Sequence, residues 1–240
     1  NVAVDDGGGI RNDGKLTVLD STVHGNEATR WGSVGGGIYS PVIASDPELE
    51  VVNSTISGNV AGDQGGGIWC EGIVTLVDST VSGNTAAHTG GGIRNNGHLT
   101  VRDSTIAHNR AGTTGGGLHH RGLSATLSGT ILAGNTAAEG GADCHGAIRS
   151  QGRNLVQSRD GCSGWNEADG DRLGADPNIP SEAGATPLYT TLNTQLVCPS
   201  KRRISSPLPT SSASAACTLC VTACCRSSLI VMDMAGDPPG

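Results

Sequence analysis

Two acidic side chains recur at the same place in successive segments of the chain and could share a cation. Asp78 and Asp103 are each followed by Ser-Thr and an aliphatic residue, and the same alignment adds Asp20, Asn53 and Ser128. If these segments stack as neighbouring strands, the Asp78 and Asp103 carboxylates lie about 4.8 Å apart. Oxygen ligands of this kind suit Ca²⁺. Hydrogen bonds from Ser79, Ser104 or turn amides are the alternative, and we expect that structural role ahead of a calcium site.

The other residues that commonly carry chemistry do not converge in the sequence. A glycosidase needs two carboxylates in one cleft, and a lyase needs an acidic cluster with an Arg or Lys base. His24, His88, His98 and His108 fall at different places in the aligned segments. The Gly triplets lack the Lys-Ser/Thr of a phosphate-binding loop. We therefore predict no catalytic residue and no cofactor.

One aligned position carries side chains that could contact a ligand. Its members are aromatic, cationic or imidazole groups, namely Arg11, Tyr39, Trp69, Arg94 and His119. His120, next to His119, should point to the opposite face of an extended strand. An outward stripe of this kind could bind a glycan by stacking, and a plain solvated face is the alternative.

These alignments depend on an internal repeat, which is the clearest pattern in the chain. A GGG-[IL] motif begins at Gly7, Gly35, Gly65, Gly90 and Gly115, and a degenerate GGA begins at Gly140. Between these motifs a second pattern recurs: LTVLDSTVHGN from Leu16, LEVVNSTISGN from Leu49, VTLVDSTVSGN from Val74, LTVRDSTIAHN from Leu99 and ATLSGTILAGN from Ala125.

Each repeat has the pattern of short strands separated by tight corners. Alternating apolar and polar residues, as in Leu16-Thr17-Val18, favour a strand, and Gly triplets would break a helix. We predict three short strands and three corners per repeat. The fold class is therefore all-β: a single-stranded right-handed parallel β-helix, a pectin-lyase-like solenoid with about 25 residues per coil. Three aliphatic columns should fill it: Ile10/Ile38/Ile68/Ile93/Leu118, Leu16/Leu49/Val74/Leu99/Ala125 and Val23/Ile56/Val81/Ile106/Ile131.

An asparagine ends each second pattern. Stacked amides can hydrogen-bond from coil to coil, as in cross-β stacks. We predict a structural ladder formed by Asn26, Asn59, Asn84, Asn109 and Asn135.

These motifs resemble those of a known group of proteins. GGGI…LTV.DST..GN.A is similar to the repeat of bacterial right-handed β-helix proteins, and to the GGA[ILV] and Asn-containing repeats of chlamydial-type polymorphic outer-membrane proteins. GADCHGAIRSQGRNLVQSRDGCSGW from Gly141, GADPN from Gly174 and GATPLY from Gly184 resemble the end of β-helix surface proteins with a choice-of-anchor C-terminus. The resemblance implies a secreted or cell-surface bacterial protein.

Two cysteines agree with that location. Cys144 and Cys162 flank the last coil-like segment, and their spacing suits a disulfide that closes a cap. A disulfide implies an oxidising compartment. Two free buried thiols are the alternative.

Composition limits the core and the partners. The 240 residues include 38 Gly and no Phe, and aromatic residues make up 2%, so the core must be narrow and aliphatic. A net charge of −7 argues against nucleic acid as a partner, and no stretch has the roughly 20 apolar residues of a membrane-spanning helix.

The repeat also divides the chain. We expect β-helix coils over residues 1–157, beginning inside a repeat as if N-terminally truncated, and a cap region over 158–189. The repeat pattern stops near Thr190. Residues 190–240 are Ser-, Pro- and Cys-rich, and we expect them to be disordered, either out of frame after a frameshift or a natural linker.

We therefore predict a non-catalytic, secreted or cell-surface repeat protein that is structural, adhesive or glycan-contacting, with a surface glycan or a cell-surface protein as its partner. A fragment of a polysaccharide lyase or glycoside hydrolase on the same fold is the alternative, since fold alone does not determine activity.

Overall fold

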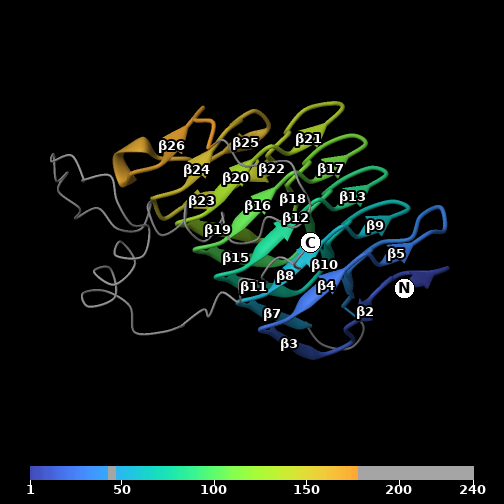
Figure 1. The fold of residues 1–240 in the computed structure, drawn as a ribbon. Helices are drawn as coiled ribbons and strands as arrows, with labels where there is room; N and C mark the ends of the chain where they lie inside the picture. Colours follow the sequence, from blue (N-terminus) through green and yellow to red (C-terminus); the bar gives the residue numbers. More distant parts are fainter. Residues whose placement is uncertain (43–46, 178–240) are drawn as a thin grey trace, which may run out of the picture. The chain divides into compact units, whose positions relative to one another are not determined.

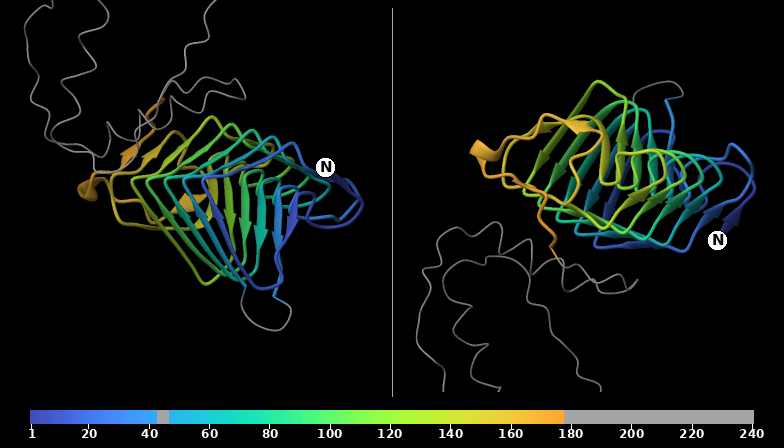
Figure 2. Two further views of the ribbon diagram at one scale, coloured as in Figure 1. Left: turned by 60° about the horizontal axis from the view of Figure 1, so that its bottom comes forward. Right: turned by 90° about the horizontal axis from the view of Figure 1, so that it is seen from above.

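The computed structural model describes residues 1–42 and 47–177, in which short parallel strands stack into the coils of a right-handed parallel β-helix (Figure 1). Each coil from β1 to β24 contributes one strand to each of four sheets, which we name A to D, and β25 and β26 extend sheets B and D further. Figure 2 shows the equivalent strands aligned along the stack. This confirms the predicted fold class. The predicted boundary at residue 190 and all of 190–240 lie outside the described residues.

The sheets have the following strands, in the order in which they pair. Sheet A contains β1 (Val2–Ala3), β5 (Glu27–Ala28), β9 (Val60–Ala61), β13 (Thr85–Ala86), β17 (Arg110–Ala111) and β21 (Thr136–Ala137). Sheet B contains β2 (Ile10–Arg11), β6 (Ile38–Ser40), β10 (Ile68–Cys70), β14 (Ile93–Asn95), β18 (Leu118–His120), β22 (Cys144–Ala147) and β25 (Cys162–Ser163).

Sheet C contains β3 (Lys15–Leu19), β7 (Glu48–Val52), β11 (Ile73–Val77), β15 (His98–Arg102), β19 (Ser124–Ser128) and β23 (Arg149–Ser150). Sheet D contains β4 (Thr22–His24), β8 (Thr55–Ser57), β12 (Thr80–Ser82), β16 (Thr105–Ala107), β20 (Ile131–Ala133), β24 (Leu155–Val156) and β26 (Arg172–Leu173). A short 3-10 turn, η1 (Glu167–Asp169), lies between β25 and β26.

The number of strands per coil differs from the predicted three. The additional strand belongs to sheet A, is two residues long and directly follows the ladder asparagine, as Thr85–Ala86 follows Asn84. Two residues are too short to show an alternating pattern. The inward residue of this strand is Ala in coil after coil, so the backbone of sheet A approaches the core closely: Ala28, Ala61, Ala86 and Ala111 are all buried.

The aliphatic columns form the core because every strand pairs in register with its equivalent. Ile68 pairs with Ile38 on one side and with Ile93 on the other, and all three are fully buried. In sheet C, Val74 lies between Leu49 and Leu99 in the same way. Burial of a large aliphatic side chain stabilises the fold by about 1.5–3 kcal/mol, and each coil contributes several.

The last repeat pairs one residue away from the predicted alignment. Ile106 pairs with Leu132, and Ile131 pairs with Thr105 on the outer face. In Thr130-Ile131-Leu132 two adjacent apolar residues compete for the core, and only one of them can face inward in a strand. Ile131 is buried nonetheless, because it packs with Leu155, Ala133 and Ala175 on the outside of sheet D.

The same one-residue correction applies at two corners. Because Arg102 pairs with Ser128, the residue equivalent to Asp103 is Gly129 and not Ser128. Because Leu118 pairs with Cys144, the equivalent of the triplet that begins at Gly115 begins at Gly141 and not at Gly140.

Each glycine of a triplet is required for a different contact, as the triplet Gly90–Gly92 illustrates. A Cβ on Gly90, whose φ is +66°, would lie 2.8 Å from Cβ of the outward residue Arg94. A Cβ on Gly91 would lie 2.4 Å from the Arg110 carbonyl. A Cβ on Gly92 would lie 2.5 Å from the Gly117 oxygen and 2.9 Å from the Asn109 amide. The triplet therefore allows close contact both between coils and with the ladder.

We expect Gly92→Ala to destabilise the β-helix by about 3 kcal/mol or more, because its Cβ would collide with backbone in the next coil. Gly14→Ala is the matched control, since a Cβ there meets nothing within 4 Å and its φ is not positive. Thermal unfolding followed by circular dichroism measures both. Equal melting temperatures for the two variants would show that the corners do not pack as described.

Candidate contact surface and the ladders that position it

The asparagines form a continuous buried ladder along the corner between sheets D and A. Each Nδ2 donates to Oδ1 of the next coil's asparagine, at 2.9 Å for Asn59 to Asn84 and 2.9 Å for Asn84 to Asn109. Each backbone N–H donates to the same oxygen. Nδ2 also donates to a carbonyl of the preceding coil, as Asn84 does to Ile56. The ladder residues are Asn26, Asn59, Asn84, Asn109 and Asn135.

The ladder has a direction, and its two ends differ accordingly. At one end, Asn1 donates through Nδ2 to Oδ1 of Asn26 at 3.1 Å. At the other end, Asn135 donates to Oδ1 of Asp143 at 2.9 Å, and Oδ2 of Asp143 accepts the Ser158 N–H. Asp143 is 1% exposed. Burial raises its pKa to about 6, although the hydrogen bonds from Asn135 and residues 157–158 act in the opposite direction.

The role of Asp143 was not predicted from the sequence. In the corrected register it replaces the third glycine of the triplet, the position at which a Cβ elsewhere collides with the next coil. A non-glycine residue at that position is therefore the sequence signal that the ladder ends there.

A second ladder runs along the corner between sheets C and D and is built from hydroxyl groups. The N–H of Ser54 donates to Oγ of Ser79, and the N–H of Ser79 donates to Oγ of Ser104, both at 3.1 Å. At the same corner in the following coils, the Thr130 N–H donates to Oδ1 of Asn154, and Asn154 donates to the buried carboxylate of Asp171.

The candidate calcium ligands lie beside this hydroxyl ladder. Asp78 and Asp103 occupy equivalent corners with a φ of 48° each. The hydroxyls of Ser79 and Ser104 donate to the Val77 and Arg102 carbonyls rather than to these carboxylates. Burial and, to a lesser extent, Asp103 raise the pKa of Asp78. Across residues 1–42 and 47–177, no group of three His, Cys, Asp or Glu side chains is arranged to hold a metal.

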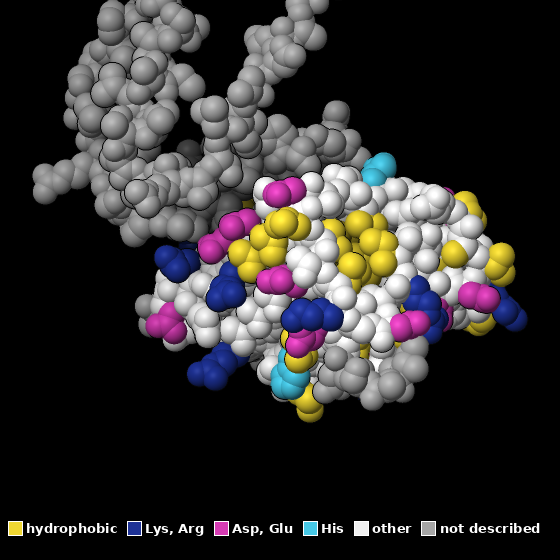
Figure 3. Space-filling model, turned by 90° about the horizontal axis from the view of Figure 1, so that it is seen from below, with side chains coloured by type: hydrophobic (Ala, Val, Ile, Leu, Met, Phe, Trp, Pro, Cys, Tyr) yellow, Lys and Arg dark blue, Asp and Glu magenta, His cyan; other side chains and the backbone are white. Residues whose placement is uncertain are grey.

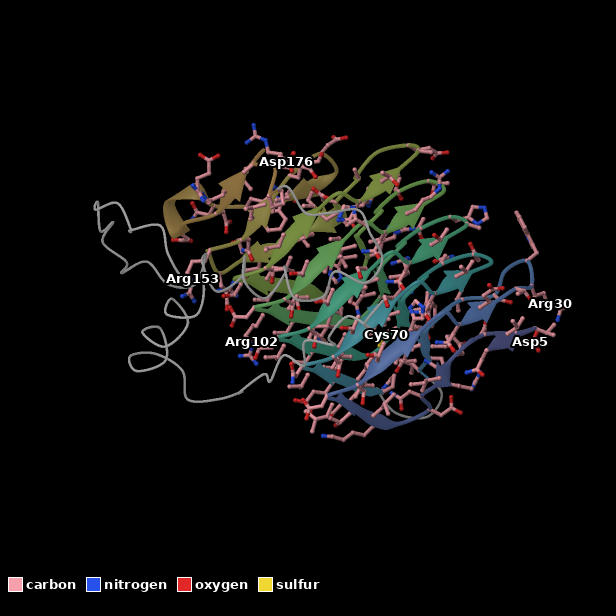
Figure 4. The ribbon with its side chains drawn as sticks, viewed as in Figure 1. Asp5, Arg30, Cys70, Arg102, Arg153 and Asp176 are labelled. Atoms are coloured by element: carbon pink, nitrogen blue, oxygen red, sulfur yellow. A yellow bond between two sulfur atoms is a disulfide. The ribbon has the colours of Figure 1, made fainter. Side chains whose placement is uncertain are left out.

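The two predicted cap cysteines are joined by a disulfide. Cys144 continues the inward column of sheet B, and Cys162 belongs to β25, which pairs with β22. Their Cα atoms are 5.7 Å apart. Cys70 is a free, buried cysteine in the interior of the coils (Figure 4).

The outward aromatic and cationic residues form one column on sheet B, and His145 extends it. The order is Arg11, Tyr39, Trp69, Arg94, His119, His145, which we name the sheet-B stripe. The Arg11 guanidinium carbon lies 5.0 Å from the Tyr39 ring centroid, and the Tyr39 and Trp69 centroids are 5.2 Å apart. The His119 and His145 centroids are 4.6 Å apart. The column therefore contains two stacked groups of planar side chains, Arg11–Tyr39–Trp69 and His119–His145, with Arg94 between them.

Corner residues that precede sheet B hold the stripe in place. Nε of Arg94 donates to Oε1 of Gln64 at 3.1 Å, and Nη1 donates to the Asn95 carbonyl. Oγ1 of Thr114 lies 3.1 Å from Nδ1 of His119. The column was predicted from the sequence but the roles of Gln64 and Thr114 were not, because the residue before the Gly triplet varies among the coils.

The electrostatics of the stripe centre on Arg94, which is 6% exposed. Burial, together with Arg121, lowers its pKa to about 10, so the guanidinium stays charged near neutral pH. Burial, Arg94 and His145 lower the pKa of His119 to about 4, so that ring is neutral. Elsewhere on the surface, basic and acidic side chains are interspersed, as on the face in Figure 3 and in the Arg30–Asp5 pair (Figure 4).

The stacked parallel sheets, the two ladders and the sequence repeat place this chain in the class of β-solenoid repeat proteins. A family model described as the Chlamydia polymorphic membrane protein repeat matches residues 53–71, which include the ladder residue Asn59 and the triplet Gly65–Gly67. No curated protein and no solved structure matches the chain significantly. Within the described ranges, no helix has the length and apolar character needed to span a membrane.

We expect Asp143→Ala to destabilise the protein by about 2–4 kcal/mol at pH 5, because Asn135 Nδ2 and the Ser158 N–H would lose their acceptor. The pKa of Asp143 is raised in the folded state, from 3.8 to about 6, so the folded protein binds the extra proton between these values. The wild type should therefore lose stability as the pH rises through that range. The difference between wild type and variant should be smaller at pH 7 than at pH 5, as measured by urea unfolding. Glu139→Ala, at an exposed acid, is the control; a pH-independent difference would contradict the assignment.

Reduction of the disulfide should lower stability by about 3 kcal/mol, because it releases a loop of 18 residues. Cys144→Ala/Cys162→Ala should behave like the reduced wild type in thermal unfolding, and a reductant should not affect this variant further. If alkylation of the unreduced wild type labels both cysteines, the bond is absent.

Proposed function

We propose that this chain is a non-catalytic repeat protein of the cell surface, which uses the side of its β-helix as a rigid contact surface for adhesion. Its location is supported by the repeat match, because the matched family is described as a membrane-protein repeat. A disulfide in the described cap agrees with an oxidising compartment outside the cytosol.

The observation that carries the contact role is the sheet-B stripe. Tyr39 and Trp69 present neighbouring rings, tilted by 36°, on the outside of a sheet, where the fold does not require aromatic side chains. Tyr, Trp and Arg are the residues most enriched at the energetic centres of binding surfaces. A stack fixed by strand register also loses little entropy on binding, because its side chains are already ordered.

Adhesion and catalysis can be separated in one set of samples. The full chain is incubated with cultured cells and with polysaccharides, and both bound protein and new reducing ends are measured. We expect retention on cells without new reducing ends, and a loss of about tenfold for Trp69→Ala. Thr75→Ala, an outward position on sheet C, is the matched control and should bind as the wild type does.

Two outcomes would overturn the proposal. Equal retention of wild type and Trp69→Ala would show that the stripe is not the contact surface. New reducing ends that depend on the protein would favour the alternative of a carbohydrate-cleaving enzyme.

A further inference from the structure

We propose that the sheet-B stripe binds a carboxylated polysaccharide, with a sugar ring stacked on Trp69 and Tyr39 and its carboxylate, or that of the next sugar, at Arg94. This inference deepens the proposed contact role by naming the chemistry of the partner, and it rests on that role.

The aromatic part of the stripe fits a sugar ring. Trp69 and Tyr39 are both half-buried, and their rings are tilted by 36° at a centroid distance of 5.2 Å. The resulting platform is longer than one ring along the axis of the coils. Among the described residues, Nε1 of Trp69 is buried without a hydrogen-bond partner. Because this nitrogen has no surface open to solvent, the platform is formed by the ring faces and not by the donor group.

The charge next to this platform selects an acidic sugar over a neutral one. Arg94 follows Trp69 by one coil, and its Nε and Nη1 are held by neutral acceptors. No carboxylate in the described part of the chain forms an ion pair with Arg94. The charge of Asp63 acts on Arg94 without a direct ion pair, because the Asp63 carboxylate contacts His88. A buried guanidinium without a directly bound counter-ion is unfavourable, and a planar carboxylate matches its geometry. Arg121 adds a second positive charge near Arg94.

The geometry also favours a polymer that runs along the β-helix axis. Successive stripe residues are spaced by the strand separation of about 4.8 Å, which is comparable to the length of one sugar unit. His119 and His145 continue the stripe beyond Arg94, and Nε2 of His119 is buried without a partner among the described residues. Tyr39, Trp69 and His145 are half-buried, whereas Arg94 is 6% and His119 4% exposed. A chain of sugars could therefore stack on the Tyr39 and Trp69 rings and meet the small exposed part of the Arg94 side chain in the next coil.

The negative net charge of the protein argues against binding of an acidic polysaccharide through general electrostatic attraction. With a net charge of −7, the protein repels polyanions at long range. Binding of an acidic polysaccharide would therefore depend on the local stripe and not on general attraction. Arg102, an exposed arginine outside the stripe (Figure 4), provides the matched control.

The experiment measures binding of the full chain at 0.15 M salt to immobilised polygalacturonate, hyaluronate and polysialic acid. Methyl-esterified polygalacturonate, dextran and polyglutamate are measured alongside. We expect at least one carboxylated polysaccharide to bind about tenfold more tightly than the neutral polymers and polyglutamate. Arg94→Gln should remove that preference, and Trp69→Ala should remove binding altogether. Arg102→Gln should bind as the wild type does, and thermal unfolding confirms that each variant is folded.

The remaining outcomes overturn the proposal. Binding to none of the carboxylated polysaccharides, or equal binding to the neutral ones, excludes an acidic glycan. Equal losses for Arg94→Gln and Arg102→Gln indicate unspecific charge effects, and stronger binding to polyglutamate indicates an acidic peptide. If adhesion to cells still depends on Trp69 in these cases, only the glycan proposal fails. If that dependence is also absent, the contact role fails with it.

Discussion

The hydrogen bonds of the buried asparagine ladder constrain the rest of the coil. An asparagine such as Asn109 uses both amide protons and its oxygen within the stack, so every coil must place the next amide within about 3 Å. The amide can come this close only where the adjacent backbone segment carries no side chain. Gly92 lies against the Asn109 amide for this reason. The Gly triplet and the ladder therefore depend on each other, and the strands pair in register because both recur once in every coil.

The direction of the ladders determines how the β-helix can end. Each rung donates toward the C-terminal coils, so the last rung requires a group that accepts without donating in return. Asp143 supplies it for the amide ladder, and Asp171 does the same for the hydroxyl ladder through Asn154. A carboxylate in a buried position is costly unless it is well hydrogen-bonded, and each of these accepts from two directions. A cap of this kind differs from a simple polar cover, because it completes a chain of donors.

Much of this architecture follows from the sequence because the repeat fixes alignment. The inward columns as far as Leu118, Ala125 and Ile106, the asparagine ladder, and the sheet-B stripe from Arg11 to His119 were predicted from spacing alone. His145 and the fourth strand, two residues long, were not. The position of Ile131 depended on a choice between two adjacent apolar residues that only packing decides. The contacts of Gln64 and Thr114 with the stripe were beyond prediction, since the residue type before the Gly triplet varies among the coils.

Equivalent residues of successive coils form columns that face either the core or the outside of the β-helix. Packing restricts the residue types of an inward column, and it does not restrict those of an outward one. The inward column of sheet B is Ile, Ile, Ile, Ile and Leu over five coils, because neighbouring coils must interdigitate at constant volume. The outward column at the adjacent position changes at nearly every coil, from Arg to Tyr, Trp, Arg and His. Strand register gives both columns the same spacing, so the outward sequence becomes a linear order of chemical groups on a rigid support. Recognition on such a surface depends on which group follows which along the axis, and the Trp69–Arg94 step is where the stripe changes from aromatic to cationic.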